Sequence, residues 1–332
     1  MSTVIQSGMY ISLSKEDYAV IENDIELFRT NETAPDNRYK FTVNKFLNNI
    51  FVNMFDRRKF DPDSVRRTRK KDAVGFNIKP NKAIIAKTTE AGLDPESDYS
   101  ADFAAYYIQF IEEYCRMTLI DRERVFYKQL IGDLMNDIEL KYLLQLIKND
   151  KWDTYIFPYA VKVSDDVHKC YITGFALRKT ESGYIYKKTL CVPLNKILNY
   201  QRIEKINPEK QIFFEENSDI QSYSDMKEYI EYRFRTDGVL YLSDILRDVT
   251  VRLSDNGREM LLSRTLYRPF YQFDENDNYL IHFRATQLQT FMYFFKFGRE
   301  AEILQPKKYR DFFLQKYKES YLLYSKDESG LE

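Results

Sequence analysis

The segment GMYISLS (residues 8–14) alternates apolar and polar side chains, which is the pattern of a β-strand with one buried face. The segment GFNIKPN (residues 75–81) has the same pattern 67 positions further along, counted from Gly8 to Gly75. The apolar side of the two strands would consist of Met9, Ile11, Leu13, Phe76 and Ile78. The opposite side, which faces solvent, would carry Tyr10, Ser12, Asn77 and Lys79. Two such strands predict an internal repeat in the N-terminal part of the chain.

Two helices are predicted to follow each of these strands. The second helix of each copy has an apolar face, and six positions of the two faces agree at a constant offset of 60 residues. They are Val43, Phe46, Leu47, Ile50, Phe51 and Met54 in the first copy and Phe103, Tyr106, Tyr107, Phe110, Ile111 and Tyr114 in the second. Any two amphipathic helices share such spacing, so the prediction depends on the strand–helix–helix order, which occurs twice. Chance similarity is the alternative to the repeat, and a small helical domain with an ordinary exposed sheet face is the alternative to a sheet face with a binding role.

A run of basic residues lies between the two copies, in a chain whose net charge is -1. It consists of Arg57, Arg58, Lys59, Arg66, Arg67, Arg69, Lys70 and Lys71. Acidic residues, in contrast, are spread along the whole sequence. A local basic run in a neutral chain favours contact with a polyanion such as a nucleic acid. The alternative, a solvated linker, has equal weight.

Composition is that of a globular protein with room for two or three domains, at 332 residues, 44% hydrophobic and 30% charged. The sequence contains no N-terminal export signal and no apolar run of about 18 residues. We therefore expect a cytoplasmic protein that does not bind a membrane.

Catalytic and metal-binding signals are sparse. Cys115, Cys170 and Cys191 have no paired spacing, which favours reduced thiols over disulfides or zinc. The chain has two histidines and none of the common phosphate-loop, zinc-protease or nucleophile motifs. We expect no metal, no cofactor and no enzymatic activity. A nuclease that acts through scattered carboxylates is the enzymatic alternative.

The repeated strand–helix–helix unit resembles the ribbon-helix-helix family. That resemblance implies that the two strands, within residues 1–120 of one chain, pair as an antiparallel ribbon over a core of four helices. It also implies that Tyr10, Ser12, Asn77 and Lys79 contact nucleic acid, and that phosphates meet the basic run and the helix N-termini near Thr42 and Asp102. Pro80 departs from the family pattern and fits only a strand end or edge.

The middle of the chain is predicted to form a helix over residues 130–138 and then five strands joined by short turns. The strands are expected at residues 141–147, 154–163, 169–177, 184–192 and 197–203, with residues 122–127 as a further strand or short connector. Five short strands with brief turns and one leading helix favour a small β-barrel.

Three blocks of this region resemble the WYL domain, which is an Sm-like barrel. The blocks are FPYAV (residues 157–161), KCYITG (residues 169–174) and PLNKI (residues 193–197). Tyr171 and Gly174 match the family well. Four positions depart from it: Cys170, Ile172, Leu190 and Lys196.

The WYL resemblance implies a barrel over residues 121–205 that binds nucleic acid or a nucleotide-like ligand on one face. The candidate residues for that face are Tyr159, Tyr171, Thr173, Lys187, Lys188 and Lys196. The alternative for Tyr159 and Tyr171 is that they belong to the barrel core.

The C-terminal segment is predicted to have the order β-α-β-β-α-β with a trailing helix, which is a ferredoxin-like arrangement. The expected elements lie at residues 249–253, 257–266, 270–273, 279–285, 288–297, 302–304 and from Pro306 onward. The stretch FFKFGREAEILQPKKYRDFFLQK (residues 294–316) resembles the end of the C-terminal extension that accompanies WYL domains. That resemblance implies self-association of residues 206–332 as a homodimer. The whole chain is thus predicted to be an α+β protein of three domains.

The WYL resemblance and the ribbon-helix-helix resemblance together suggest a function. WYL proteins are mostly bacterial transcriptional regulators, whereas the ribbon-type N-terminus resembles the WYL accessory proteins of type VI-D CRISPR systems. That resemblance implies a non-catalytic accessory protein that binds single-stranded RNA. The accessory would modulate an RNA-guided CRISPR ribonuclease, and stimulation is the expected direction. The 16% aromatic content and the clustered Arg and Lys also suit unpaired strands. The alternative is a transcriptional regulator that binds double-stranded DNA with the same ribbon.

Overall fold

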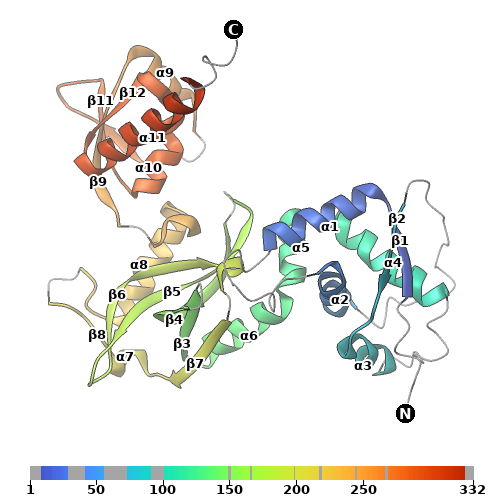
Figure 1. The fold of residues 1–332 in the computed structure, drawn as a ribbon. Helices are drawn as coiled ribbons and strands as arrows, with labels where there is room; N and C mark the ends of the chain where they lie inside the picture. The colour runs from blue at the N-terminus through green and yellow to red at the C-terminus, as the bar shows by residue number, and fades with distance from the viewer. Residues whose placement is uncertain are drawn as a thin grey trace, which may run out of the picture. The chain divides into compact units, whose positions relative to one another are not determined.

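The computed structural model describes residues 9–28, 42–55, 73–90, 101–148, 151–164, 167–197, 199–216, 219–243, 245–265 and 268–325. This part of the chain is a mixed α+β structure with eleven α-helices and three β-sheets (Figure 1). The chain divides into two compact units, Met1–Ser222 and Tyr223–Glu332. The predicted three-domain division stays a prediction. No helix in the described ranges is both long and apolar enough to cross a membrane.

The two strands of the repeat pair as predicted. Strand β1 (Met9–Leu13) runs antiparallel to β2 (Val74–Ile78) in a two-stranded sheet. Its apolar side is buried, because Ile11, Leu13 and Ile78 lie in the core of the unit. The alternation of period two therefore predicted correctly which side of the ribbon faces the helices.

Each strand is followed by two helices, which confirms the strand–helix–helix order. They are α1 (Lys15–Phe28) and α2 (Val43–Met54) in the first copy and α3 (Lys82–Glu90) and α4 (Ala101–Arg116) in the second. The side chains of Ser14 and Asn81 cap α1 and α3, accepting the N–H groups of Asp17 at 3.1 Å and Ile84 at 3.0 Å. These two caps are again 67 positions apart, so the same local signal starts the first helix of each copy.

The core of this part lies where the apolar faces of α2 and α4 meet. The Phe51 ring stacks on that of Tyr107 at a centroid distance of 4.7 Å, and Phe46 meets Tyr114 edge-on at 6.1 Å. All four side chains are buried. Nine of the twelve positions that agree at an offset of 60 are buried in this core, and Val43 and Met54 pack against it.

One prediction for the connecting region is wrong. Residues 122–127 were expected to be a strand or connector, but they belong mostly to helix α5 (Leu119–Phe126), which leads into α6 (Lys128–Glu139). Thr118 starts α5 by accepting the Asp121 N–H at 3.3 Å. Glu123 interrupts the apolar pattern of α5 although its side chain is buried, and this hid the helix from an analysis based on hydrophobic spacing.

The middle sheet contains the five predicted strands and one more. They are β3 (Tyr142–Lys148), β4 (Lys151–Ser164), β5 (Lys169–Lys179), β6 (Tyr184–Pro193), β7 (Asn199–Lys205) and β8 (Ile212–Phe213). Their order is β7-β3-β4-β5-β6-β8, and β8, which follows the short helix α7 (Pro208–Gln211), pairs parallel to β6. Closure of this sheet into a barrel stays a prediction.

The C-terminal unit begins with helix α8 (Tyr223–Thr236) and then has the predicted element order. The elements are β9 (Arg247–Leu253), α9 (Asp255–Ser263), β10 (Tyr271–Phe273), β11 (Leu280–Ala285), α10 (Gln287–Phe294), β12 (Ala301–Gln305) and α11 (Lys307–Ser325). The strands pair antiparallel in the order β10-β11-β9-β12, so the first strand lies at the centre beside the third and the fourth.

The packing of this unit is aromatic. Phe294 of α10 stacks on Phe283 of β11 at 5.4 Å, and Tyr309 and Phe313 of α11 are buried in the same cluster. Gly298, in the short 3-10 helix η7 (Phe295–Glu300) between α10 and β12, has a φ of 57°, a positive value that glycine adopts without strain.

Candidate nucleic-acid interface

The polar side of the ribbon lies open to solvent. Tyr10 keeps 66% of its surface exposed, Asn77 and Lys79 are exposed, and Ser12 is half-buried. Tyr10, Ser12 and Asn77 lie on β1 and β2, and Lys79 follows directly after β2. The structure thus brings all four predicted ribbon residues to one surface, and their contact with nucleic acid stays a prediction.

A pseudo-twofold axis passes through the ribbon at Tyr10. The repeat offset of 67 makes Tyr10 and Asn77 equivalent, and the strand register pairs these same two residues. Ser12 pairs with Gly75, although its repeat equivalent is Lys79. The two halves of the ribbon therefore present different groups, an aromatic ring and a hydroxyl on one strand against an amide and an amine on the other.

Tyr10 lies along the ribbon and across the opposite strand. A Cβ atom added to Gly75 would lie 1.8 Å from the Tyr10 hydroxyl oxygen and 2.5 Å from its Cζ. The tip of the ring therefore occupies the space above the Gly75 Cα. Gly75 is the diagonal neighbour of Tyr10 in the register, at a distance that a tyrosine side chain can span.

Two asparagines of α2 hold the end of the ribbon. The Lys79 N–H donates to Asn44 Oδ1 at 2.8 Å, and Asn48 Nδ2 donates to the Lys79 carbonyl at 3.0 Å. Asn48 Oδ1 also accepts the Asn81 N–H at 3.4 Å. Thr42 caps the same first turn of α2, accepting the Lys45 N–H at 3.3 Å. Lys79, predicted as a ribbon contact to nucleic acid, and the N-terminus of α2, predicted as a phosphate contact, are thus neighbours.

The two other asparagines of α2 bind the end of α5. Asn49 Nδ2 donates to the Phe126 carbonyl at 2.9 Å, and Asn53 Nδ2 donates to the Val125 carbonyl at 2.8 Å. Hydrophobic spacing did not indicate this role of α2. A signal was present, because four asparagines within one predicted helix are unusual for a residue of low helix propensity.

Lysines satisfy the last carbonyls of α2. Lys87 Nζ donates to the Val52 carbonyl at 2.7 Å, and Lys128 Nζ donates to the Asn53 carbonyl at 2.7 Å. Cations at a helix C-terminus complement the partial negative charge of that end. These two lysines therefore have structural partners, unlike Lys79, whose backbone is held but whose side chain is exposed.

A buried carboxylate ties the two copies together. Asp24 of α1, with no exposed surface, accepts the Tyr114 hydroxyl at 2.7 Å and pairs with Arg122 at 2.6 Å. Burial, followed by the adjacent Asp24 carboxylate, raises the pKa of Tyr114, which keeps the phenol protonated as a donor. This contact joins α1, α4 and α5.

Several predicted contacts lie outside the described residues. They are the basic run, namely Arg57, Arg58, Lys59, Arg66, Arg67, Arg69, Lys70 and Lys71, together with the side chain of Asp102. Pro80 follows the end of β2, as its missing N–H required.

The predicted WYL ligand face is divided between core and surface. Tyr171 and Thr173 are buried, and Thr173 Oγ1 donates to the Ala160 carbonyl at 2.9 Å. Lys187, Lys188 and Lys196 are exposed. Tyr159 is half-buried, and its ring packs edge-on against Phe175 at 5.9 Å. The six residues therefore do not share one exposed face.

Two of these residues are the extra residues of β-bulges. The pairing of β4 with β5 passes from Pro158–Gly174 to Ala160–Thr173 and leaves out Tyr159. The pairing of β5 with β6 passes from Ala176–Lys188 to Leu177–Tyr186 and leaves out Lys187. A bulge re-aims its side chain, and no sequence period marks it in advance.

Lys187 forms an ion pair with Glu215, which lies after β8. This hydrogen-bonded lysine lowers the pKa of Glu215 below its ordinary value, so the pair is charged at neutral pH. The charge of Lys187 is thus partly neutralised by Glu215, which weakens it as a ligand contact. Lys196, in the 3-10 turn Leu194–Lys196, is exposed.

No group of three or more His, Cys, Asp or Glu side chains in the described ranges could hold a metal ion. Thr250 Oγ1 lies 3.1 Å from His282 Nδ1, and His282 Nε2 lies 3.0 Å from Asp274 Oδ2. Thr250 and His282 are opposite each other on β9 and β11, so their hydrogen bond is a cross-strand contact. The sequence alone did not indicate it.

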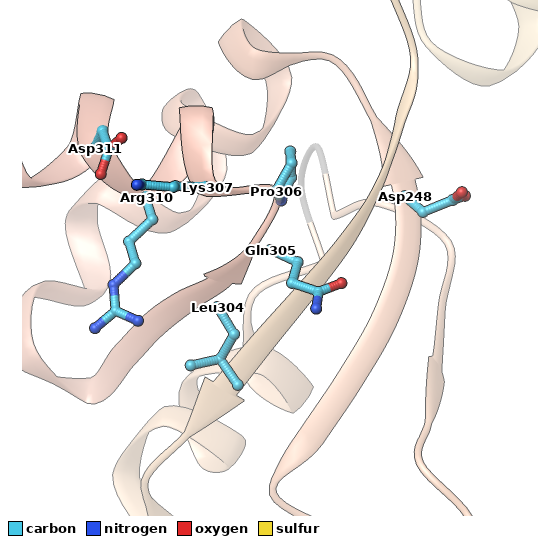
Figure 2. A pocket seen from close by; sticks show the side chains of 7 residues that line it. All are labelled: Asp248, Leu304, Gln305, Pro306, Lys307, Arg310 and Asp311. Carbon is cyan, nitrogen blue, oxygen red and sulfur yellow. The ribbon is translucent and has the colours of Figure 1, made fainter.

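The C-terminal unit has a surface cavity of about 570 Å³ at the start of α11 (Figure 2). Its lining residues are Asp248, Leu304, Gln305, Pro306, Lys307, Arg310 and Asp311. Two of them are basic and two are acidic, and Arg310 is paired with Glu302 at 2.7 Å. The mixed charge indicates no single class of ligand.

Comparison with known proteins gives a shared fold. No protein-family model and no curated protein matches the chain. A solved structure described as "Crystal structure of a CRISPR Cas-related protein" matches with a TM-score of 0.67 at 16% identity, over 96% of this chain and 94% of that chain.

A second solved structure, "Proteasome accessory factor B/C (PafBC) of Arthrobacter aurescens", is 11% identical over 72% of this chain and 35% of that one. Its TM-score of 0.29 does not indicate a common fold.

The first of these two comparisons shows that the chain shares the fold of a CRISPR Cas-related protein over nearly its whole length.

Proposed function

We propose that this protein binds single-stranded RNA with the outward face of the β1–β2 ribbon and acts as a non-catalytic accessory that stimulates an RNA-guided CRISPR ribonuclease. The observation that carries the proposal is the exposed Tyr10 ring beside Asn77 and Lys79 on a ribbon with unlike halves. The shared fold with a CRISPR Cas-related protein supports the CRISPR context.

Unpaired bases are the natural partners of this face. An exposed aromatic ring offers a stacking surface to any base, and stacking requires a base that is not already stacked within a duplex. Asn77 supplies a donor and an acceptor for base edges, and Lys79 supplies a cation for phosphate. One short strand of RNA satisfies all three groups.

The unlike halves of the ribbon also argue against a palindromic target. Proteins that read paired half-sites in DNA present the same residues twice, related by the symmetry axis. Here the axis relates Tyr10 to Asn77 and Ser12 to Lys79, so the two halves do not offer the same contacts. A single strand has direction and no twofold symmetry, which fits such a surface.

The basic run would add electrostatic affinity. Eight lysines and arginines lie between residues 57 and 71, directly before β2 in the sequence. Each phosphate that they neutralise releases counterions, so affinity should fall steeply with salt concentration. We assign this run, together with Lys79, to phosphate contact, and Tyr10 and Asn77 of the ribbon to base contact.

Self-association would be the role of the C-terminal unit. The last turns of α11 carry large apolar side chains that are exposed, including Tyr321, Leu323 and Tyr324. Such a row at a helix end is suited to burial against a second copy. We propose that the protein is a homodimer that presents two ribbons.

The second candidate function is a regulator that binds double-stranded DNA. An antiparallel ribbon above a helical core is an element that can enter a major groove, and the β1–β2 pair has that form. A DNA-binding regulator would use the same ribbon face that carries Tyr10. The two functions therefore differ in the nucleic acid that this face prefers, single-stranded RNA or duplex DNA.

The deciding experiment is a binding titration by fluorescence anisotropy. A labelled single-stranded RNA of about 20 nucleotides, which exceeds one ribbon site, and duplex DNA of the same sequence are compared over a salt series. We expect tighter binding of the RNA at every salt concentration, with affinity for both falling as salt rises. Tighter binding of the duplex throughout would reject the accessory function and favour the regulator.

A further inference from the structure

We propose that Gly75 is a positioning residue for Tyr10, and that the ring it lays along the ribbon is what selects unpaired bases over duplex. The inference rests on the proposed function and deepens it, because it names the residue pair that sets the class of nucleic acid. Gly75 itself offers no side chain to a ligand, so it acts only through Tyr10.

The geometry leaves no room for any other residue at position 75 with this Tyr10 orientation. The hydroxyl oxygen of Tyr10 lies 1.8 Å from where a Cβ would be, and the Cζ lies at 2.5 Å. Real non-bonded contacts of carbon begin at about 3.0 Å or more, so a methyl group and the ring cannot coexist. The φ of Gly75 is not in the left-handed region, and the position therefore requires glycine for space alone.

The ring, and not the backbone, would give way. The clashing atoms belong to the far end of the Tyr10 side chain, which is largely exposed and can rotate about its χ angles into solvent. The apolar underside of the ribbon, with Ile11, Leu13 and Ile78, is unaffected because it faces the core. Alanine also has less backbone entropy to lose than glycine in a strand.

The orientation matters because it decides what the centre of the ribbon presents. Tyr10 and Asn77 lie at the pseudo-twofold axis, where a ribbon that reads a major groove projects side chains toward base edges. A ring that lies toward Gly75 projects little and instead forms a platform beside Asn77. A splayed base can stack there, whereas a paired base within a duplex cannot reach it.

Three variants separate the ring from its orientation. Tyr10→Ala removes the platform, Gly75→Ala displaces it, and the double variant tests whether the two changes act through one feature. Gly132→Ala in α6 is the matched control, because a Cβ at Gly132 would meet nothing within 4 Å. Circular dichroism and the thermal midpoint monitor the fold of each protein.

The measurement is the ratio of the dissociation constants for single-stranded RNA and for duplex of the same sequence. We expect Gly75→Ala to weaken RNA binding by about 5- to 160-fold, the range that corresponds to one lost base stack, and to leave duplex binding nearly unchanged. In the Tyr10→Ala background, Gly75→Ala should have no further effect. Gly132→Ala should bind as the wild type does.

Two results would overturn the inference. One is an unchanged RNA-to-duplex ratio in Gly75→Ala while the wild type prefers RNA, which leaves the proposed function intact. The other is an equal loss from Gly75→Ala with and without the Tyr10 ring, because the glycine would then act through something else. Preference of the wild type for duplex would instead be a failure of the proposed function itself.

Discussion

At the scale of single residues, the exposed and the buried polar groups differ in how far sequence could predict them. The outward positions Tyr10 and Asn77 were predictable because a strand alternates strictly and its apolar side must face the core. The buried carboxylates Asp24 and Glu123 were not. Their partners Arg122 and Cys170 lie 98 and 47 positions away, and no local pattern indicates such pairs.

Loss of the Asp24 carboxylate should destabilise the N-terminal helices strongly. In Asp24→Asn, Arg122 would lose its ionic partner in a largely buried site, and breaking a buried pair in this way costs about 3–5 kcal/mol. Urea unfolding followed by circular dichroism measures the change. Glu16→Gln, on the exposed side of the same helix, is the control and should change stability by less than about 0.5 kcal/mol. Equal effects of the two variants would contradict the role of Asp24.

The Glu123 carboxyl should make stability depend on pH in the unusual direction. Burial raises its pKa above the ordinary 4.5, although the Cys170 N–H that it accepts opposes this. The folded state therefore holds this proton more tightly than the unfolded state does, so this group's contribution to stability falls as pH rises from about 4.5 through the raised value.

Glu123→Gln tests that direction, because the amide oxygen can still accept the Cys170 N–H without carrying a charge. Relative to the wild type, the variant should gain thermal stability as pH rises from 4.5 to 7, the interval that starts at the ordinary value. A stability difference between the two proteins that stays constant over this interval would contradict a raised pKa at Glu123.

At the scale of elements, local start signals explain what was predicted well. Ser14 and Asn81 mark the same helix start in both copies, and the strands of the middle sheet have clear alternation and turns. Helix α5 was missed because a buried charged residue interrupts its apolar face. Strand β8 has two residues, too few for any period, and its pairing with β6 is decided by tertiary contact.

The asparagines of α2 should support the end of the ribbon. Asn48→Ala removes the hydrogen bonds to the Lys79 carbonyl and the Asn81 N–H, and leaves these two part-buried backbone groups without that partner. We expect a loss of about 1–3 kcal/mol in the free energy of unfolding. Lys45→Ala, an exposed position on the same helix, serves as control. If both variants unfold at the same denaturant concentration, Asn48 does not hold the ribbon.

At the scale of the whole molecule, the shared fold with a CRISPR Cas-related protein extends over 96% of the chain although identity is only 16%. Element order in the C-terminal unit was predictable because its strands and helices have distinct periods and clear breakers such as Gly298. The division of the predicted WYL face between buried and exposed residues was not predictable. It arises from two bulges and from the burial of Tyr171, which depend on how the strands pair.

Assembly should depend on the end of α11. A charge at Leu323, which is 68% exposed, would be incompatible with an apolar contact between two copies. We expect Leu323→Glu to be monomeric in light scattering at concentrations where the wild type is dimeric. Lys308→Glu, in the exposed first turn of the same helix, should remain a dimer. A Leu323→Glu protein that stays dimeric would place the interface elsewhere.

Cross-linking tests directly whether the ribbon face contacts single-stranded RNA. RNA that contains photoreactive uridine is irradiated with the wild-type protein, and the adducts are located by mass spectrometry after trypsin digestion. We expect adducts in the peptides that span residues 1–15 and 72–82, which contain Tyr10 and Asn77. Adducts confined to other peptides, at RNA concentrations that saturate binding, would contradict this contact.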